Sequence, residues 1–327
     1  MIGLFENMAL SLAIVVAVLF AVINLYFVVA RRYSLVDVPN ERSSHSKSTI
    51  VGAGILFYLT AIWYFLADPN DSIYFILGIS LLAFISFMDD RMEINSLLRL
   101  GVHIAAILLL LLQLQILVYL DWWTILLIIV VLVGTLNAYN FMDGINGITG
   151  IYSLVCLLSV YFFSRFNHYD DLILYESCAV VVFLFYNFRK KAVCFSGDVG
   201  SVTMAFIVVM ILLNQMVLSQ RWETILFLAV YGVDSVLTIV HRISNRENIF
   251  KAHRSHIYQL LVHNKKWSHL KVSLVYGGIQ LLINTIYFLL ADANAFTVTA
   301  VSLGVFVVLG LLSIILRRQL NESPVHS

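Results

Sequence analysis

The stretch "MALSLAIVVAVLFAVINLYFVVARRY" (residues 8–33) decides the class of fold, because it carries no charged side chain until Arg31 and Arg32. An α-helix needs about 20 predominantly apolar residues to cross the hydrocarbon core of a bilayer. No small-residue cleavage site follows the apolar run, so we interpret it as a retained first membrane span and not as a signal peptide.

The composition of the whole chain agrees with this interpretation. The 327 residues are 61% hydrophobic and 12% charged, and the mean hydropathy is +0.92. Soluble domains carry about 25% charged residues, so this chain lacks the polar surface of one. We therefore expect an all-α polytopic integral membrane protein, with residues 1–327 forming one domain. The net charge of +1 gives no field that would attract nucleic acid.

Apolar runs between polar breaks predict a bundle of about 11 transmembrane helices. They lie near 8–30, 51–67, 72–88, 99–119, 123–139, 148–165, 171–188, 202–220, 223–241, 272–291 and 296–316. If the N-terminus is outside, all Lys and Arg residues except Arg165 and Arg221 fall in inner segments or the C-terminal tail. Positive charge marks the cytoplasmic side, so we expect an external N-terminus, a cytoplasmic C-terminus and a cytoplasmic-face active site.

The sequence "FMDDRMEINSLLRL" (87–100) places two adjacent carboxylates, Asp89 and Asp90, where the third span ends. Together they could bind a divalent cation, or one could accept a proton. A solvated turn would explain the pair equally well when it is considered alone.

The sequence "NAYNFMDGINGITG" (137–150) follows a nearly pure apolar run. Asn137, Asn140 and Asp143 recur every three residues, which places them along one face of a helix. The glycines that follow allow a sharp turn or a close approach of the backbone to a ligand. The alternative is a simple turn between two spans, although the regular spacing argues against it.

Two further inner segments carry polar chemistry. In "KKAVCFSGDVGS" (190–201), glycines flank Asp198 and leave its carboxylate uncrowded as a metal ligand, while the backbone could bind phosphate. In "HRISNRENIFKAHRSHIYQLL" (241–261), His253, Arg254 and His256 suit phosphate oxygens better than zinc. The alternatives are an ordinary turn and a basic stretch that contacts anionic lipid.

Isolated residues in the spans give weaker signals. Asp234 lies within the ninth span, where a charge is costly, and we expect it to line the same cavity as the inner loops. Glu176 lies near the outer end of the seventh span and is expected to reach the interface. The three cysteines show no paired or metal-type spacing, so we expect reduced or lipid-facing thiols.

The carboxylates, amides and Arg/His residues thus gather on one predicted membrane face. Carboxylates and amides suit Mg²⁺, which commonly bridges substrate phosphates. The residues therefore predict a metal-assisted phosphoryl-transfer site whose substrate is a nucleotide-like anion and whose acceptor could be a lipid.

The order and spacing of these motifs, from "DVPNERSSH" to "HRSHIYQ" (roughly residues 37–260), resemble the polyprenyl-phosphate N-acetylhexosamine-1-phosphate transferase superfamily. The resemblance implies transfer from a UDP-N-acetylhexosamine to undecaprenyl phosphate in the bacterial inner membrane, giving undecaprenyl-diphospho-sugar and UMP. It implies Mg²⁺, with Mn²⁺ as a substitute, and leaves a homodimer open.

The resemblance also assigns roles to individual residues. Asp89 and Asp90 would be catalytic, with Asp89 as the base or organiser for the lipid phosphate, and Asp198 would join them as a metal ligand with Asn140. The implied substrate-binding residues are Asn140, Asp143, Asn146, Phe195, Arg99, His253, Arg254 and His256. Within this set, Asn146 and Phe195 would hold uracil.

Two of the motifs refine the resemblance. The family's Pro-Arg-Gly-Gly-Gly appears here as "IVGAG" (50–54), which leaves these residues without an implied role. "HRSHIYQ" is similar to members that initiate O-antigen or capsule chains, some of which use UDP-linked deoxysugars. Direct attack and a covalent aspartyl intermediate both stay open.

Two other function classes fit a polytopic chain. A secondary transporter would place charges near the midplane of repeated halves, and the sequence shows no internal repeat. A non-catalytic lipid-binding protein would need the basic loops but not Asp89, Asp90 and Asp198.

Overall fold

The computed structural model describes residues 2–37, 48–67, 73–92, 94–163, 169–248 and 253–321, and it confirms an almost entirely α-helical chain with apolar helices suited to a membrane. In chain order the elements are α1 (Ile2–Arg32), β1 (Val36–Asp37), β2 (Thr49–Ile50), α2 (Ile55–Ala67), α3 (Ile73–Asp89), α4 (Ser96–Gln113), η2 (Ile116–Val118), α5 (Trp122–Met142), α6 (Ile148–Phe163), α7 (Asp170–Asn187), α8 (Gly197–Ser219), η3 (Trp222–Leu228), α9 (Ala229–Ser244), α10 (Ile257–His263), α11 (His269–Leu289) and α12 (Ala295–Asn321).

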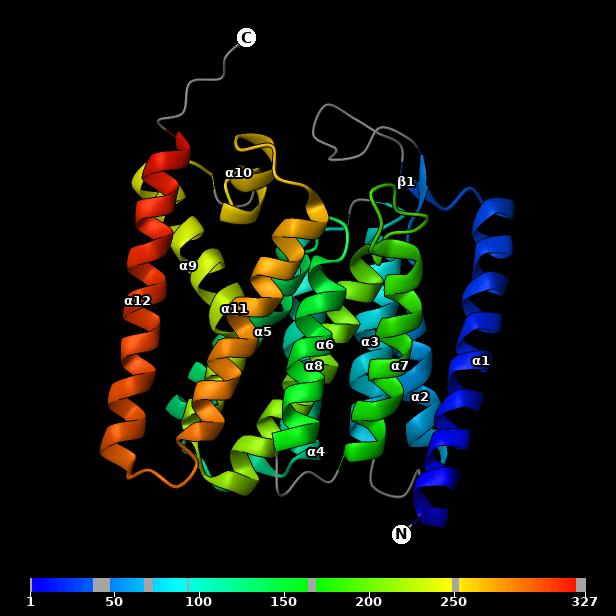
Figure 1. Cartoon of the computed structure of the whole chain (residues 1–327), viewed down its shortest axis with the longest axis horizontal. Helices are drawn as coiled ribbons and strands as arrows, with labels where there is room; N and C mark the ends of the chain where they lie inside the picture. Colours follow the sequence, from blue (N-terminus) through cyan, green and yellow to red (C-terminus); the bar gives the residue numbers. More distant parts are fainter. Residues whose placement is uncertain are drawn as a thin grey trace.

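Helix α8 forms the centre of the bundle. It packs against α2, α3 and α5, and nearly every side chain from Val199 to Gln215 is buried. Helices α1 and α12 lie at the two sides of the bundle (Figure 1) and are largely exposed. A helix that is apolar all round must be covered by other helices or by lipid, so the exposed apolar faces of α1 and α12 suit a bilayer.

Within the part of the chain that the structure describes, seven helices are long and apolar enough to cross a membrane. They are Met8–Arg32, Ser96–Gln113, Trp122–Met142, Gly197–Ser219, Trp222–Ser244, His269–Leu289 and Ala295–Leu320, and shorter apolar helices span Ile55–Leu66, Ile73–Asp89 and Ile148–Phe163. Each of the eleven expected ranges contains a helix, although eleven crossings stay a prediction. The short helix α10 was not expected.

The polar loops gather at one end of the bundle. Strand β1, helix α10 and the end of α12 lie at this end, whereas α1 begins at the opposite end (Figure 1). The antiparallel pairing of β1 with β2 joins Val36 to Ile50. Ser268 begins α11 here by accepting a hydrogen bond from the backbone N–H of Lys271. Lys251 and residues 38–47 of the predicted inner loops lie outside the described residues.

One expectation about a single side chain needs correction, and the expectation of reduced cysteines is confirmed. Glu176 does not reach the interface: it is fully buried, and within the described residues neither carboxyl oxygen has a hydrogen-bond partner. Glu176 belongs to α7, which packs against α6, α1 and α2. Its buried side chain therefore points into the bundle. The cysteines are free thiols, but Cys156 and Cys194 are buried inside the protein and do not face lipid.

Candidate active site

The site begins with a backbone contact between residues 50–54 and the loop that precedes α8. The N–H of Phe195 donates to the carbonyl of Ile50 at 2.7 Å, and the N–H of Ala53 donates back to the carbonyl of Phe195 at 3.0 Å. The N–H of Gly54 donates to Ser196 at 3.0 Å. Backbone hydrogen bonds therefore fix the Gly-Asp-x-Gly turn against the start of α2.

Glycines allow the two backbone segments to approach closely enough for this contact to form. A methyl group on Gly54 would overlap the backbone of Gly200, and one on Gly200 would overlap Gly54. Gly52 and Gly197 have φ values of +82° and +71°, a region that favours glycine. The sequence "IVGAG" thus has a structural role, which is to let α2 and α8 begin side by side.

The second wall of the site is formed by the loop after α5. Gly147 donates its N–H to the side-chain oxygen of Asn187 at 2.6 Å, and the amide of Asn187 donates to the carbonyl of Cys194 at 2.9 Å. The amide of Asn146 donates to the carbonyl of Arg189 at 2.7 Å. Asn187 therefore links the two polar loops that the sequence singled out.

Between these walls lies a cavity of about 500 Å³. Its lining residues come from widely separated parts of the chain: Val36, Asp37, Val51, Asp90, Asn140, Asp143, Gly144, Ile145, Asn146, Asn187, Phe195, Ser196, Gly197, Asp198, Arg254, Gln259 and His269. Seven of the predicted site residues are in this set: Asp90, Asn140, Asp143, Asn146, Phe195, Asp198 and Arg254. Folding brings these residues together although up to 164 positions separate them (254 minus 90).

Asp90 is held by the N-terminus of α8. Its carboxylate accepts the backbone N–H groups of Asp198 at 3.0 Å and Val199 at 3.4 Å, which are unpaired donors in the first turn of a helix. Burial and the nearby Asp198 carboxylate nevertheless raise the pKa of Asp90 to about 7. The cavity thus places two acidic groups close together at a helix N-terminus.

Asp143 adds a third carboxyl group to the same cavity. The hydroxyl of Ser196 donates to its Oδ2, and burial raises the pKa of Asp143 to about 7. The charge of Asp198 acts in the same direction. An anionic cluster of this kind is stabilised by a bound cation.

The adjacent aspartates Asp89 and Asp90 have different hydrogen-bond partners. Asp89 points to Arg99, whose Nη1 donates to Asp89 Oδ2 at 2.5 Å, and the N–H of Ile94 donates to Oδ1 at 3.0 Å. In the part of the chain that the structure describes, neither Asp89 nor Arg99 lines the cavity. Asp90 is therefore the member of the pair in the described lining, while Asp89 lies outside that lining but still contacts the side chain of Asp198.

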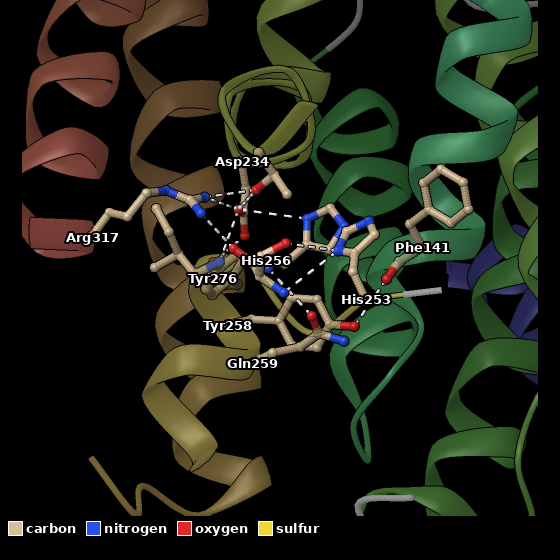
Figure 2. A network of polar contacts seen from close by, with 11 residues as sticks. Phe141, Asp234, His253, His256, Tyr258, Gln259, Tyr276 and Arg317 are labelled. Carbon is tan, nitrogen blue, oxygen red and sulfur yellow. Dashed lines mark hydrogen bonds and ion pairs between the residues drawn. The ribbon is translucent and has the colours of Figure 1, made fainter. Parts of the chain in front are cut away.

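The segment that leads into α10 contributes only some of its predicted residues to the cavity. Arg254 and Gln259 line the cavity, whereas His253, His256 and Asp234 are absent from its described lining. Burial and the neighbouring His256 lower the pKa of His253 to about 4, so its imidazole is neutral at pH 7. His256 and Asp234 are almost completely buried and belong to the network in Figure 2. The expectation that Asp234 lines the cavity is therefore wrong.

Sequence reasoning missed several lining residues. Asn187 and His269 lie at the ends of predicted spans, and the N–H of Asn146 donates to His269 Nδ1 at 3.4 Å. A histidine at the inner end of the tenth span was a usable signal for the site. Asp37 and Ser196 lie beside motifs but carry no pattern of their own.

The residues present suit a magnesium ion better than a metal held by protein ligands alone. Within the described residues, no group of three or more His, Cys, Asp or Glu side chains is arranged to hold a metal. The cavity instead offers Asp198 and Asn140, which interact through their side chains. Mg²⁺ is commonly bound by one or two carboxylates and completed by substrate phosphates, so this donor set fits it.

The fold and the cavity together define a multi-pass membrane protein with an anionic, polar site at one end of its bundle. Residues 72–216 match the family model described as glycosyl transferase family 4. An undecaprenyl-phosphate alpha-N-acetylglucosaminyl 1-phosphate transferase of Escherichia coli K12 is 26% identical over 278 residues, which cover 75% of this chain and 74% of the relative.

A probable undecaprenyl-phosphate N-acetylglucosaminyl 1-phosphate transferase of Bacillus subtilis is 25% identical, over 72% of this chain and 71% of the relative. The family match and these relatives support the polyprenyl-phosphate N-acetylhexosamine-1-phosphate transferase superfamily, as the motifs do.

Proposed function

We propose that the protein transfers an N-acetylhexosamine-1-phosphate group from a UDP-sugar to undecaprenyl phosphate. An oxygen of the lipid phosphate attacks the sugar-bearing phosphorus, the bond to the UMP oxygen breaks, and undecaprenyl-diphospho-sugar and UMP are the products. The single observation that carries the proposal is the convergence of Asn140, Asp143, Asn146, Phe195 and Asp198 on one cavity that also contains Arg254. The relatives, which are named for this class of transfer, support it.

The cavity offers groups for each part of the donor. Phe195 supplies an aromatic ring and Asn146 an amide, which suit stacking and hydrogen bonding to a uracil ring. Arg254 supplies a guanidinium group, which suits phosphate oxygens. Asp90, with a pKa near neutrality, can hold or accept a proton next to the reacting phosphates.

We propose that Asp198 and Asn140 hold Mg²⁺ with the donor diphosphate. When it is bound, the ion neutralises negative charge on the phosphates. The protein then contributes mainly orientation and electrostatic stabilisation, because phosphoryl transfer asks for little covalent chemistry from the protein.

We place the reaction at the cytoplasmic face of a bacterial inner membrane. Strand β1, which contributes Val36 and Asp37 to the cavity, lies at the end of the bundle where the predicted basic inner segments lie (Figure 1), and positive charge favours the cytoplasmic side. The resemblance of "HRSHIYQ" to O-antigen and capsule-initiating members favours a role at the start of a cell-surface polysaccharide.

The test is UMP release by purified protein in detergent with Mg²⁺, undecaprenyl phosphate and a panel of UDP-sugars. The panel begins with UDP-N-acetylglucosamine and includes UDP-linked N-acetylfucosamine and N-acetylquinovosamine. We expect UMP formation with at least one donor that depends on both the lipid and Mg²⁺. Failure with every donor, or full activity of an Asp198→Asn variant, overturns the proposal and favours a transporter or a non-catalytic lipid-binding protein.

A further inference from the structure

Asp234 is the centre of a buried polar network that the cavity does not include (Figure 2). Its Oδ2 accepts the hydroxyl of Tyr276 at 2.7 Å. Its Oδ1 accepts the N–H of Ile257 at 3.0 Å and the hydroxyl of Thr238 at 3.2 Å. The His256 ring lies beside it, with Nδ1 at 3.6 Å from Oδ1. Both carboxyl oxygens are therefore occupied by donors from the protein itself.

Arg317 ties the last helix to this network. From α12, its Nη1 donates to the carbonyl of Ser255 at 2.6 Å and its Nη2 donates to the hydroxyl of Thr238 at 2.7 Å. Nη2 also lies 4.0 Å from Oδ1 of Asp234. The planar guanidinium fork suits such a double contact, and it holds the loop of α10 and helix α9 at once.

The segment held in this way forms one side of the cavity. Arg254 and Gln259 line the cavity, and they flank the backbone atoms of Ser255 and Ile257 that Arg317 and Asp234 bind. The side-chain oxygen Oε1 of Gln259 also accepts the backbone N–H of His256 at 3.3 Å. The network thus determines where this segment begins its helix and which side chains it presents.

Tyr258 connects the same segment to the opposite wall. Its hydroxyl donates to the carbonyl of Phe141 at 2.9 Å (Figure 2), and its ring packs so closely on Gly144 that a methyl group there would overlap it. The position of α10 is therefore transmitted to the loop that carries Asp143 and Asn146.

We propose that Asp234 and Arg317 are positioning residues that hold residues 253–259 so that Arg254 and Gln259 face the donor in the cavity. The proposal rests on the proposed function for the identity of that donor. Neither residue belongs to the described lining of the cavity: both are buried, and their polar groups have partners within the protein. Their effect passes through Arg254.

The first test measures the segment itself and needs no substrate. Hydrogen–deuterium exchange of residues 253–261 is compared between wild type, Arg317→Gln and Arg318→Gln in detergent. Arg318 is the matched control because it is the adjacent, exposed arginine of the same helix. Hydrogen bonds from charged groups contribute enough that we expect exchange about 10-fold faster in Arg317→Gln, with Arg318→Gln unchanged. Equal exchange in wild type and Arg317→Gln overturns the proposal.

The second test connects the segment to the donor. Arg317→Gln is expected to raise KM for the UDP-sugar about 10-fold with a smaller change in kcat, because it weakens ground-state binding. Arg317→Lys restores a single donor and should recover part of the loss. If Arg317 acts through Arg254, the double variant with Arg254→Gln should be no worse than Arg254→Gln alone. Additive effects contradict this route.

A milder substitution tests the proposal if the variants of Arg317 fail to fold. Tyr276→Phe keeps the ring and removes one hydrogen bond to Asp234, and we expect KM to rise about 3-fold and exchange in 253–261 to increase in the same direction. If wild type releases no UMP with any donor, the proposed function fails, while the exchange comparison still decides whether Arg317 holds the segment.

Discussion

The carboxylates of the cavity and the carboxylate of Asp234 lie near the same end of the bundle, but they differ in what surrounds them. Asp198 acts as a like charge on both Asp90 and Asp143. Asp234 accepts three hydrogen bonds and has His256 and Arg317 beside it. The cavity therefore leaves negative charge for an external cation to neutralise, whereas the network neutralises its own. A buried carboxylate whose charge the protein does not neutralise indicates a binding site. A buried carboxylate whose charge the protein neutralises indicates a structural role.

The largest expected effect comes from exchanging an acid for its amide in the two regions. Asp198→Asn should reduce UMP release by about 100-fold or more while thermal stability stays close to wild type, because it removes repulsion as well as a metal ligand. Asp234→Asn should cost about 3–5 kcal/mol of stability, because it leaves the buried Arg317 guanidinium without its neighbouring carboxylate.

Both variants are measured by UMP release and by thermal unfolding in detergent. The comparison fails if Asp198→Asn unfolds at a much lower temperature than wild type, or if Asp234→Asn keeps wild-type stability.

The next effect tests whether the cavity wall depends on backbone contact. Gly54→Ala forces a methyl group into the backbone of Gly200, so we expect a reduced yield of folded protein and a loss of activity of about 10-fold or more in what remains. Gly101→Ala is the matched control, because nothing lies within 4 Å of a methyl group there. Purification yield and UMP release measure both. Wild-type behaviour of Gly54→Ala would show that α2 and α8 need not approach so closely.

The contrast between the two regions also shows how far the sequence could be interpreted. Long apolar runs predict helices because a bilayer demands a fixed length of apolar chain, and all eleven ranges contain a helix. Asn140, Asp143, Asn146 and Asp198 were found because polar residues are rare in such a chain. The sequence could not distinguish Asp89 from Asp90, since only the fold shows that Asp89 pairs with Arg99 and that Asp90 accepts an N–H group at the start of α8.

Asp234 and Glu176 were misplaced for a related reason. Their position along a span was clear, but the direction in which each side chain points depends on neighbouring helices. Helix α10 was missed because a helix of this length is stabilised by tertiary contacts, here those of Tyr258 and Asp234, and has little signal of its own.

A smaller effect is expected from pH. Burial raises the pKa of Asp143 from 3.8 to about 7, so the folded state binds its proton more tightly than the unfolded state does. The resulting stabilisation is complete below about pH 4 and is lost as pH rises through about 7. The raised pKa of Asp90 changes the stability with pH in the same direction.

In metal-free buffer the unfolding temperature should therefore fall by a few degrees between these limits. Asp143→Asn should reduce that dependence, and Mg²⁺ should raise stability at the upper pH. A slope of opposite sign would show that the cavity acids are compensated within the fold, as Asp234 is.

The smallest effect is expected at Glu176, a buried acid that belongs to neither region. Neither of its oxygens accepts a hydrogen bond from the described residues, so Glu176→Gln breaks no contact there and keeps the shape of the side chain. We expect UMP release equal to wild type and an unfolding temperature that is unchanged or slightly higher, because an amide is less costly than a carboxylate to bury. A loss of activity in this variant would mean that compensation within the fold does not separate binding from architecture, and that a buried acid outside both regions takes part in the reaction.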